Sequence, residues 1–89
     1  GTIIPVATIH SEKGFVFHVF PNDHQPAHVH VVKGGTEMRI DVSGDEPEPI
    51  ALRGKERMSD KQINQALDIA EDNYSKLQHG WRKFHDPSN

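Results

Sequence analysis

The sequence predicts an α+β fold in which a small antiparallel β-meander of four to five strands packs against one long C-terminal α-helix. Residues 2–52 consist of short β-branched and aromatic runs separated by turn residues, which is the pattern of consecutive hairpins. Residues 59–84 instead carry apolar side chains at alternating steps of four and three, which is the period of an amphipathic helix. We therefore expect the strands to come first and the helix last.

The first third of the chain predicts two strands and a loop. Residues 2–10 predict an edge strand, because their β-branched run contains a proline that a central strand tolerates poorly. Residues 11–14 (SEKG) predict a turn, and residues 15–20 (FVFHVF) predict a central strand that is apolar on both faces apart from His18. Residues 21–27 (PNDHQPA) predict a loop, because two prolines and an Asn-Asp pair oppose regular pairing.

Gly34-Gly35 lies between two alternating segments and predicts a tight hairpin, since two-residue turns of the primed types need positive φ. Such a turn fixes the register of the strands, and a slip by one residue would exchange their faces. The expected pairs are Lys33–Thr36, Val32–Glu37, Val31–Met38, His30–Arg39, Val29–Ile40 and His28–Asp41. One face then carries Val29, Val31, Met38 and Ile40, and the other carries His28, His30, Val32, Glu37, Arg39 and Asp41.

The second half of the chain predicts a loop, a short strand and the helix. Residues 43–49 (SGDEPEP) are acidic and interrupted by proline, which favours a solvated loop over a carboxylate site, and residues 50–52 predict a short fifth strand. Ser59 and Gln62 match a capping box, so we expect the helix to begin here. Its apolar stripe is Ile63, Leu67, Ala70, Tyr74, Leu77, Trp81 and Phe84.

The predicted helix is long for the size of the chain. From Asp60 to Phe84 it would span about 37 Å, whereas a compact chain of this length has a diameter of about 30 Å. The helix therefore either lies across the whole sheet or overhangs it. In the second case it offers Trp81 and Phe84 to a protein partner or to a second copy of the chain.

Composition limits the classes of protein to consider. The 89 residues are 34% hydrophobic, which allows one domain (residues 2–89, with Gly1 as a tag remnant) with a thin core that a homodimer would stabilise. The absence of cysteine excludes disulfide scaffolds and thiolate metal sites. No apolar run reaches the roughly 18 residues of a membrane span, so we expect a cytoplasmic protein. A net charge of −3 argues against coating nucleic acid, although local contact with RNA or DNA stays open.

Histidines make the third predicted strand the candidate functional region. His28 and His30 are two residues apart, so both project from one face, about 6 to 7 Å apart at the backbone. Two imidazoles so placed can share a metal ion, with His24 from the preceding loop and His18 from the neighbouring strand as further donors. The sequence thus allows a zinc, iron or manganese site, and equally allows half-buried histidines that only bind carboxylates.

A second hypothesis needs no metal. The hairpin register sets Asp41 beside His28 and Arg39 beside His30, as an oriented general base would lie next to a phosphate-binding guanidinium. Because RNA carries its own nucleophile in the 2′-hydroxyl group, these four residues would suit a ribonuclease. They would equally suit ordinary cross-strand polar pairs. A path for an anionic ligand would be extended by Lys33, Arg53, Lys55 and Arg57.

Residues 22–31 (NDHQPAHVHV) resemble the N-D/E-H-x-P-P-H-x-H-V signature of the bacterial family called domain of unknown function 4160. The resemblance extends from the aromatic strand at Gly14-Phe15 to the late Trp81, with Ala27 where a second proline is common. It implies a small bacterial cytoplasmic protein from a gene pair that resembles a toxin–antitoxin module. It highlights His24, Pro26, His28 and His30 without implying a catalytic role for any of them.

Three functional hypotheses result, and they leave open whether the protein is an enzyme. The first is a component of a two-protein module that binds its partner through the long helix or the histidine face. The second is a metal-independent ribonuclease-like toxin that uses His28, His30, Arg39 and Asp41. The third is a metal-binding protein with histidine ligands.

Overall fold

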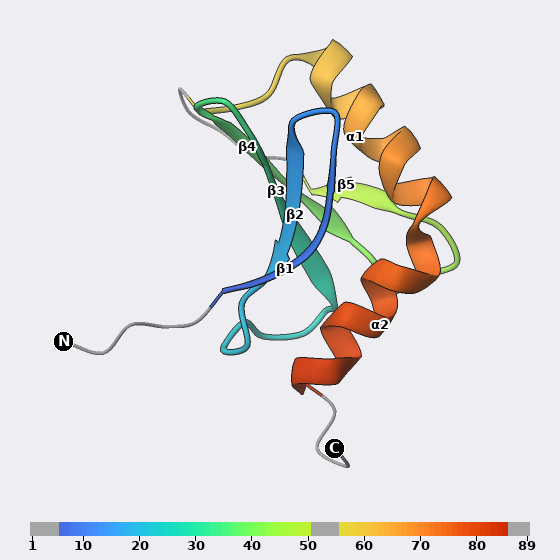
Figure 1. Cartoon of the computed structure of the whole chain (residues 1–89). Coiled ribbons are helices and arrows are strands. Elements are labelled where there is room, and N and C mark those ends of the chain that lie inside the picture. The colour runs from blue at the N-terminus through green and yellow to red at the C-terminus, as the bar shows by residue number, and fades with distance from the viewer. Residues whose placement is uncertain (1–5, 51–55, 86–89) are drawn as a thin grey trace, which may run out of the picture.

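The computed structural model describes residues 6–50 and 56–85, which form one antiparallel sheet with two helices over one of its faces (Figure 1). The strands are β1 (Ala7–Glu12), β2 (Phe15–Val19), β3 (His28–Lys33), β4 (Thr36–Asp41) and β5 (Glu48–Ile50). Each strand pairs with the next one in the chain, so the order in the sheet is the order in the sequence. The predicted α+β meander is confirmed. Within the described residues, no helix combines the length and the hydropathy that a membrane crossing needs.

The strand bounds differ from the predicted ones at both edges of the sheet. β1 continues to Glu12, which pairs with Phe15, so the first turn consists of Lys13 and Gly14 alone, with φ angles of 52° and 83°. β5 begins inside the segment predicted as a loop, because an edge strand accommodates the missing N–H of Pro49. Residues 2–5 of the first predicted strand and residues 51–52 of the fifth lie outside the described part of the chain.

The hairpin of β3 and β4 has the predicted register at every pair, from Lys33–Thr36 at the turn to His28–Asp41 at the open end. Gly34 supplies the positive φ, at 50°. The four apolar side chains that were assigned to one face are all buried, namely Val29, Val31, Met38 and Ile40. The opposite face therefore carries the histidines, the arginine and the aspartate that the functional hypotheses use.

The prediction of a single long helix is wrong. Two helices, α1 (Asp60–Asp72) and α2 (Tyr74–His85), meet at Asn73. The Nδ2 atom of Asn73 donates to the carbonyl of Ile69 at 2.8 Å, so this side chain competes with the backbone for the last turn of α1. The carbonyl of Asn73 accepts from the N–H of Leu77 at 3.0 Å, which starts α2. The break changes the direction of the helix along the sheet (Figure 1).

The start of α1 agrees with the prediction. Ser59 Oγ accepts from the N–H of Gln62 at 3.2 Å, and Gln62 Oε1 accepts from the N–H of Ser59 at 3.0 Å. The apolar stripe also reaches the sheet, because Ala70 and Leu77 are fully buried. The core consists of Phe15, Phe17, Val19, Val29, Val31, Met38, Ile40, Val42, Met58, Ala66, Ile69, Ala70, Leu77 and Trp81.

The two aromatic residues near the end of α2 that were considered as partner contacts differ in exposure. Trp81 is 3% exposed and belongs to the core, whereas Phe84 is 37% exposed. One turn of α2 also lies very close to β1, since a Cβ atom built on Gly80 would come within 2.7 Å of the side chain of Ile9. The helix therefore depends on a residue without a side chain at this contact.

Candidate functional site

The candidate site lies where the loop between β2 and β3 meets the first residues of β3. The loop begins with a turn in which the N–H of Asp23 donates to the carbonyl of Phe20 at 3.0 Å. Pro21 stands at the second position of this turn, where its fixed φ favours the conformation. The loop ends where the carbonyl of Ala27 accepts from the N–H of Val42 at 2.9 Å. Both ends of the loop are thus fixed by backbone hydrogen bonds, and Asp23 is held above β3.

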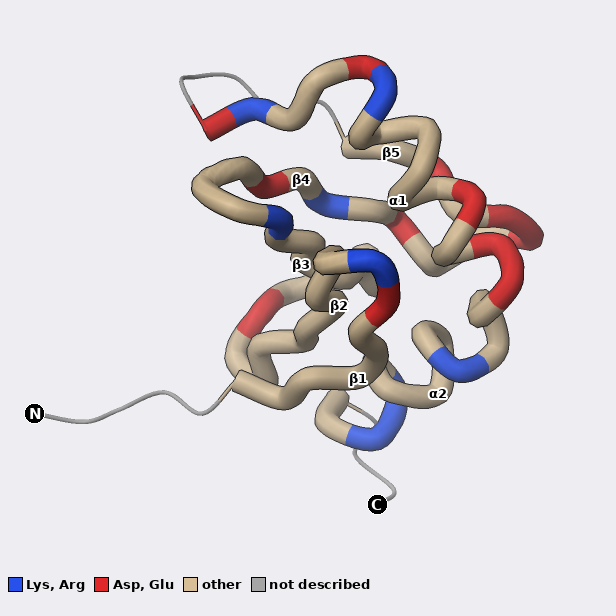
Figure 2. Tube along the Cα trace, turned by 45° about the horizontal axis from the view of Figure 1, so that its top comes forward, with Lys and Arg blue, Asp and Glu red and all other residues tan. Residues whose placement is uncertain are grey.

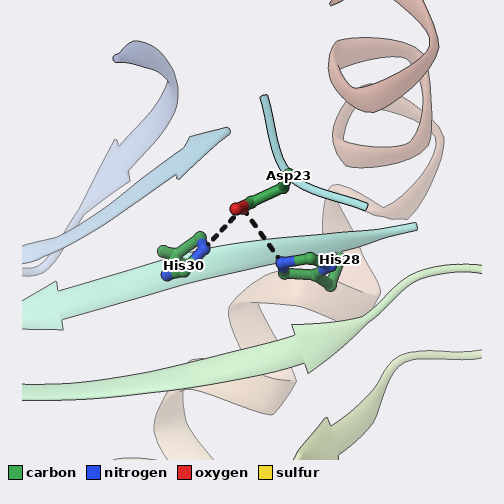
Figure 3. Close-up of side chains that lie close together, drawn as sticks. All are labelled: Asp23, His28 and His30. Carbon is green, nitrogen blue, oxygen red and sulfur yellow. Dashed lines mark hydrogen bonds and ion pairs between the residues drawn. The ribbon is translucent and has the colours of Figure 1, made fainter. Parts of the chain in front are cut away.

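Asp23 joins the two histidines of β3 in one cluster (Figure 3). Its Oδ2 atom lies 2.8 Å from Nε2 of His30 and 3.0 Å from Nε2 of His28. The three candidate ligand atoms all lie within 4.8 Å of one another. The two imidazoles project from the same side of β3, as their spacing in the sequence predicted.

The second nitrogen of His28 determines the chemistry of this cluster. Nδ1 of His28 lies 2.9 Å from the carbonyl oxygen of Pro26, and a carbonyl only accepts, so Nδ1 must carry the hydrogen. In a neutral imidazole, Nε2 then has a lone pair and no hydrogen. That lone pair faces the carboxylate oxygen of Asp23, which is also an acceptor. The contact is favourable only with a cation present, either a second proton on His28 or a metal ion among the three groups.

Electrostatics keep Asp23 in its ionised form. Burial alone would raise its pKa, but the hydrogen bond and charge of His30, together with those of His28, outweigh burial and hold the pKa below its ordinary value. On the neighbouring strand, burial and then the charge of His30 lower the pKa of His18. The site therefore favours an anionic carboxylate and an uncharged His18.

Aromatic rings enclose the cluster. His28 is 8% exposed, and its ring lies 5.2 Å from that of Trp81 at the end of α2. The ring of Phe20 meets His30 edge-on at 4.6 Å. Trp81 is in turn stacked on His85 at 3.4 Å. The helix end and the loop thus shield the carboxylate and the imidazoles from part of the solvent, which strengthens electrostatic interactions within the cluster.

The predicted four-histidine ligand set is only half assembled. His28 and His30 come together, but His24 and His18 are not among the residues whose ligand atoms converge. His24 is exposed on the loop, where it lines the same pocket as His28. The third residue of the cluster is Asp23, which the sequence reasoning treated only as a turn residue. Its position directly before the first histidine of the signature was the signal that could have identified it.

The four residues of the metal-independent hypothesis share a face, although His28 has a different carboxylate partner. Asp41 is opposite His28 in the register, but its Oδ1 accepts from the N–H and the hydroxyl of Ser43 at 2.8 and 2.6 Å. Those two hydrogen bonds lower the pKa of Asp41. The group that faces His28 Nε2 is therefore Asp23. Arg39 lines two pockets beside the cluster.

Of the basic residues that were expected to extend an anion path, Lys33 and Arg57 have side-chain partners of their own, although Arg57 forms a backbone bridge with Glu37 of β4, and the other two lie outside the described part of the chain. Lys33 is at the hairpin end of β3, where Nζ donates to the carbonyl of Lys13 at 3.0 Å and lies over the ring of Phe15. Arg57 pairs with Asp60 at 3.8 Å next to the start of α1. Residues 53 and 55 are not among those the structure describes.

Fold and site together define a small α+β protein whose loop carboxylate and strand histidines meet at one end of a β-meander. The family model described as Domain of unknown function (DUF4160) matches residues 14–82, and the chain belongs to this family. The matched segment contains the whole site, from Asp23 to Asp41, all of α1 and most of α2. Comparison with curated proteins and with solved structures gives no match.

Proposed function

We propose that the protein binds one divalent transition-metal ion, with zinc as the first candidate, through Oδ2 of Asp23 and Nε2 of His28 and His30. The observation that carries this proposal is the hydrogen bond from His28 Nδ1 to the Pro26 carbonyl. It turns the lone pair of Nε2 toward a carboxylate that has nothing to donate. Metal-binding histidines commonly have this arrangement, in which a backbone carbonyl fixes the tautomer through the other ring nitrogen.

Two of the three separations between the ligand atoms suit such an ion. Ligand atoms about 2.1 Å from a zinc ion are separated from one another by about 3.0 to 3.4 Å. The Oδ2–Nε2 separations of 2.8 and 3.0 Å are close to this range. Two histidines and one carboxylate form a ligand set for zinc and for iron. Three protein ligands leave a coordination position for water or substrate, and a bound metal would supply Lewis-acid chemistry there.

The competing explanation is an ion pair in which a doubly protonated His28 donates to Asp23. It has the same geometry and needs no metal. It also fits the metal-independent ribonuclease hypothesis, with Asp23 rather than Asp41 as the partner of the histidine. The two explanations differ in what they predict for metal content, which can be measured directly.

The test is a calorimetric titration of zinc into protein that lacks a polyhistidine tag and has been treated with chelator. We expect one equivalent to bind, and His30→Gln and Asp23→Asn each to weaken binding by about a hundredfold or more, since loss of even an outer-shell partner costs about 10- to 100-fold. His79→Gln is the matched control, because His79 is exposed on α2. Absence of binding, or equal binding by all variants, contradicts the metal site. His28→Gln is a less suitable first variant because His28 is buried.

A second proposal is that the protein acts in a two-protein module resembling a toxin–antitoxin pair. It draws on the family resemblance and on the exposed ring of Phe84 at the end of α2. We expect co-purification with the product of the neighbouring gene, and Phe84→Ser to weaken the complex. Since Phe84 is at the surface, that change should leave the unfolding temperature nearly unaltered. A wild-type chain that ignores this partner in size-exclusion chromatography would contradict the module.

A further inference from the structure

We propose that Arg39 binds a single phosphate group, so that the substrate class of the site is a small phosphate ester such as a nucleoside monophosphate. This inference rests on the proposed function, because it places the phosphate next to the metal cluster. It goes beyond that function by naming the class of ligand that would bind beside the metal cluster.

The register places Arg39 next to the cluster on the uncovered face of the sheet. Arg39 is opposite His30 of β3 on one side and opposite Ile50 of β5 on the other, and His30 is in turn opposite His18 of β2. These side chains form one row across the sheet. The alternate residues of β4, Met38 and Ile40, point into the core, so the row lies on the face away from the helices (Figure 1).

Arg39 also stands between two pockets. One is lined by Phe20, His30, Glu37 and Arg39. The other contains Asp23, His28 and Asp41 together with Arg39, and extends along the loop to His24 and Pro26. Because Arg39 belongs to both linings, a ligand held by its guanidinium would reach the metal cluster on one side and the ring of Phe20 on the other. A phosphate at Arg39 with a flat apolar group toward Phe20 fits this arrangement.

The guanidinium of Arg39 has no partner among the described residues. Arg39 is half-buried, yet its side chain makes no hydrogen bond, ion pair or ring contact with another residue in that part of the chain. Lys33 and Arg57, by contrast, each have a partner. A partly desolvated guanidinium without an acceptor is unfavourable, and a phosphate can accept two parallel hydrogen bonds from it. An anionic ligand would therefore satisfy this side chain.

The charges around Arg39 favour a ligand with a single phosphate group. Figure 2 shows the one blue segment of β4 between two red ones, which correspond to Glu37, Arg39 and Asp41. Together with Asp23, the two pockets contain three carboxylates and one guanidinium. A long nucleic-acid strand would meet these carboxylates at successive phosphates, and such binding needs several cations. A ligand with one phosphate needs only Arg39 and the metal, which offsets the charge of Asp23.

The test measures binding of adenosine monophosphate, with adenosine as the ligand that lacks the phosphate, to the zinc-loaded and to the chelator-treated protein. We expect the monophosphate to bind and adenosine to bind at least tenfold more weakly. Arg39→Gln should reduce the affinity for the monophosphate by about 10- to 100-fold, the range expected for hydrogen bonds between charged groups. Lys61→Gln, which removes a cation from the exposed surface of α1 on the other face of the sheet, should reduce it less than twofold. Both variants should keep the zinc affinity of the wild type within about twofold.

Each outcome bears on the inference separately from the metal proposal. Monophosphate binding that survives in Arg39→Gln, or that adenosine reproduces, overturns the phosphate site. The same holds if neither form of the wild type binds the monophosphate. A parallel loss of zinc affinity in Arg39→Gln would show that Arg39 only supports the fold of the cluster. Binding through Arg39 by a protein that takes up no zinc would keep the phosphate site and contradict the proposed function.

Discussion

At the scale of single residues, the proposed metal site depends on the hydrogen bonds that a few polar atoms form. The Pro26 carbonyl fixes the tautomer of His28. Asp23 accepts hydrogen bonds from both imidazoles or shares a bound cation with them, and Asp41 accepts a hydrogen bond from Ser43. None of these contacts follows from residue spacing alone. His28 and His30 could be assigned to one face from the sequence, but their carboxylate partner comes from a loop whose path the sequence does not specify.

Tyr74 allows a direct test of one such local environment. Its hydroxyl donates to the carbonyl of Gly44 at 2.8 Å, and burial, followed by the charges of Asp41 and the acidic residues of the β4–β5 loop, raises its pKa above 10.0. Because the chain has one tyrosine, phenolate absorbance reports this group alone. We expect a titration midpoint above 10.0 in the folded protein and a return to the ordinary value in denaturant.

The sign of this effect on stability follows from linkage. The folded state holds the tyrosine proton more tightly than the unfolded state, so the contribution of Tyr74 is fully present below pH 10.0. It is lost as the pH rises through the folded-state pKa. A midpoint at or below the ordinary value would show that the hydroxyl is not held against the acidic loop.

At the scale of elements, local signals determined what could be predicted. Gly34-Gly35 gave the register of β3 and β4 at every pair, because a two-residue turn permits only one pairing. Ser59 and Gln62 predicted the start of α1, because their capping box is formed by residues only three positions apart. The break at Asn73 was missed because the apolar stripe continues through it. At Asn73 the backbone leaves the helical conformation, with φ −122° and ψ 23°, and the side chain bonds to the carbonyl of Ile69.

The capping box predicts a measurable contribution to stability. Replacing Ser59 by alanine removes the acceptor for the N–H of Gln62, and we expect the free energy of unfolding to fall by about 1 kcal/mol. The control is Ser75→Ala, an exposed position inside α2, where we expect a change within about 0.5 kcal/mol. Chemical denaturation of both variants tests this, and equal effects would argue against the cap.

The contact between α2 and β1 predicts a penalty for a single methyl group. Alanine at position 80 would place its Cβ within 2.7 Å of Ile9, and overpacking of this kind costs about 1–3 kcal/mol. The gain in helix propensity offsets about 1 kcal/mol. We therefore expect Gly80→Ala to lower the free energy of unfolding by about 1 kcal/mol.

Two comparisons isolate the cause of that penalty. Shortening the opposing side chain in the double variant with Ile9→Val should recover part of the loss, since the two changes are coupled. Gly35→Ala should have little effect, because a Cβ there meets nothing within 4 Å. A Gly80→Ala variant as stable as the wild type would mean that β1 and α2 are farther apart than described.

At the scale of the whole molecule, the sheet separates packing from chemistry. One face is closed by the helices, and the other carries the row of His18, His30, Arg39 and Ile50. The acidic residues of the β4–β5 loop and of the second half of α1 gather on one side of the molecule (Figure 2). The alternation of apolar and polar residues predicted the buried and the polar face of the sheet. It did not predict that the end of α2 would bring Trp81 against His28.

Metal binding should also stabilise the whole fold, because the cluster ties the β2–β3 loop to β3. At a free zinc concentration about 100 times the dissociation constant, linkage gives about 2.7 kcal/mol, or roughly 10 to 20 °C in the unfolding temperature of a chain of this size. His30→Gln should lose the shift, and His79→Gln should keep it. Thermal unfolding with and without zinc measures this, and an unchanged temperature at that concentration would argue against binding to the native state.

The most direct test of the metal site is a crystal structure of the zinc-loaded protein with an anomalous difference map at the zinc absorption edge. We expect one peak about 2.0 to 2.2 Å from Oδ2 of Asp23 and from Nε2 of both His28 and His30. We also expect the Pro26 carbonyl still to accept from His28 Nδ1. A map without a peak at this position, with Asp23 bound to a doubly protonated His28 instead, would contradict the metal site.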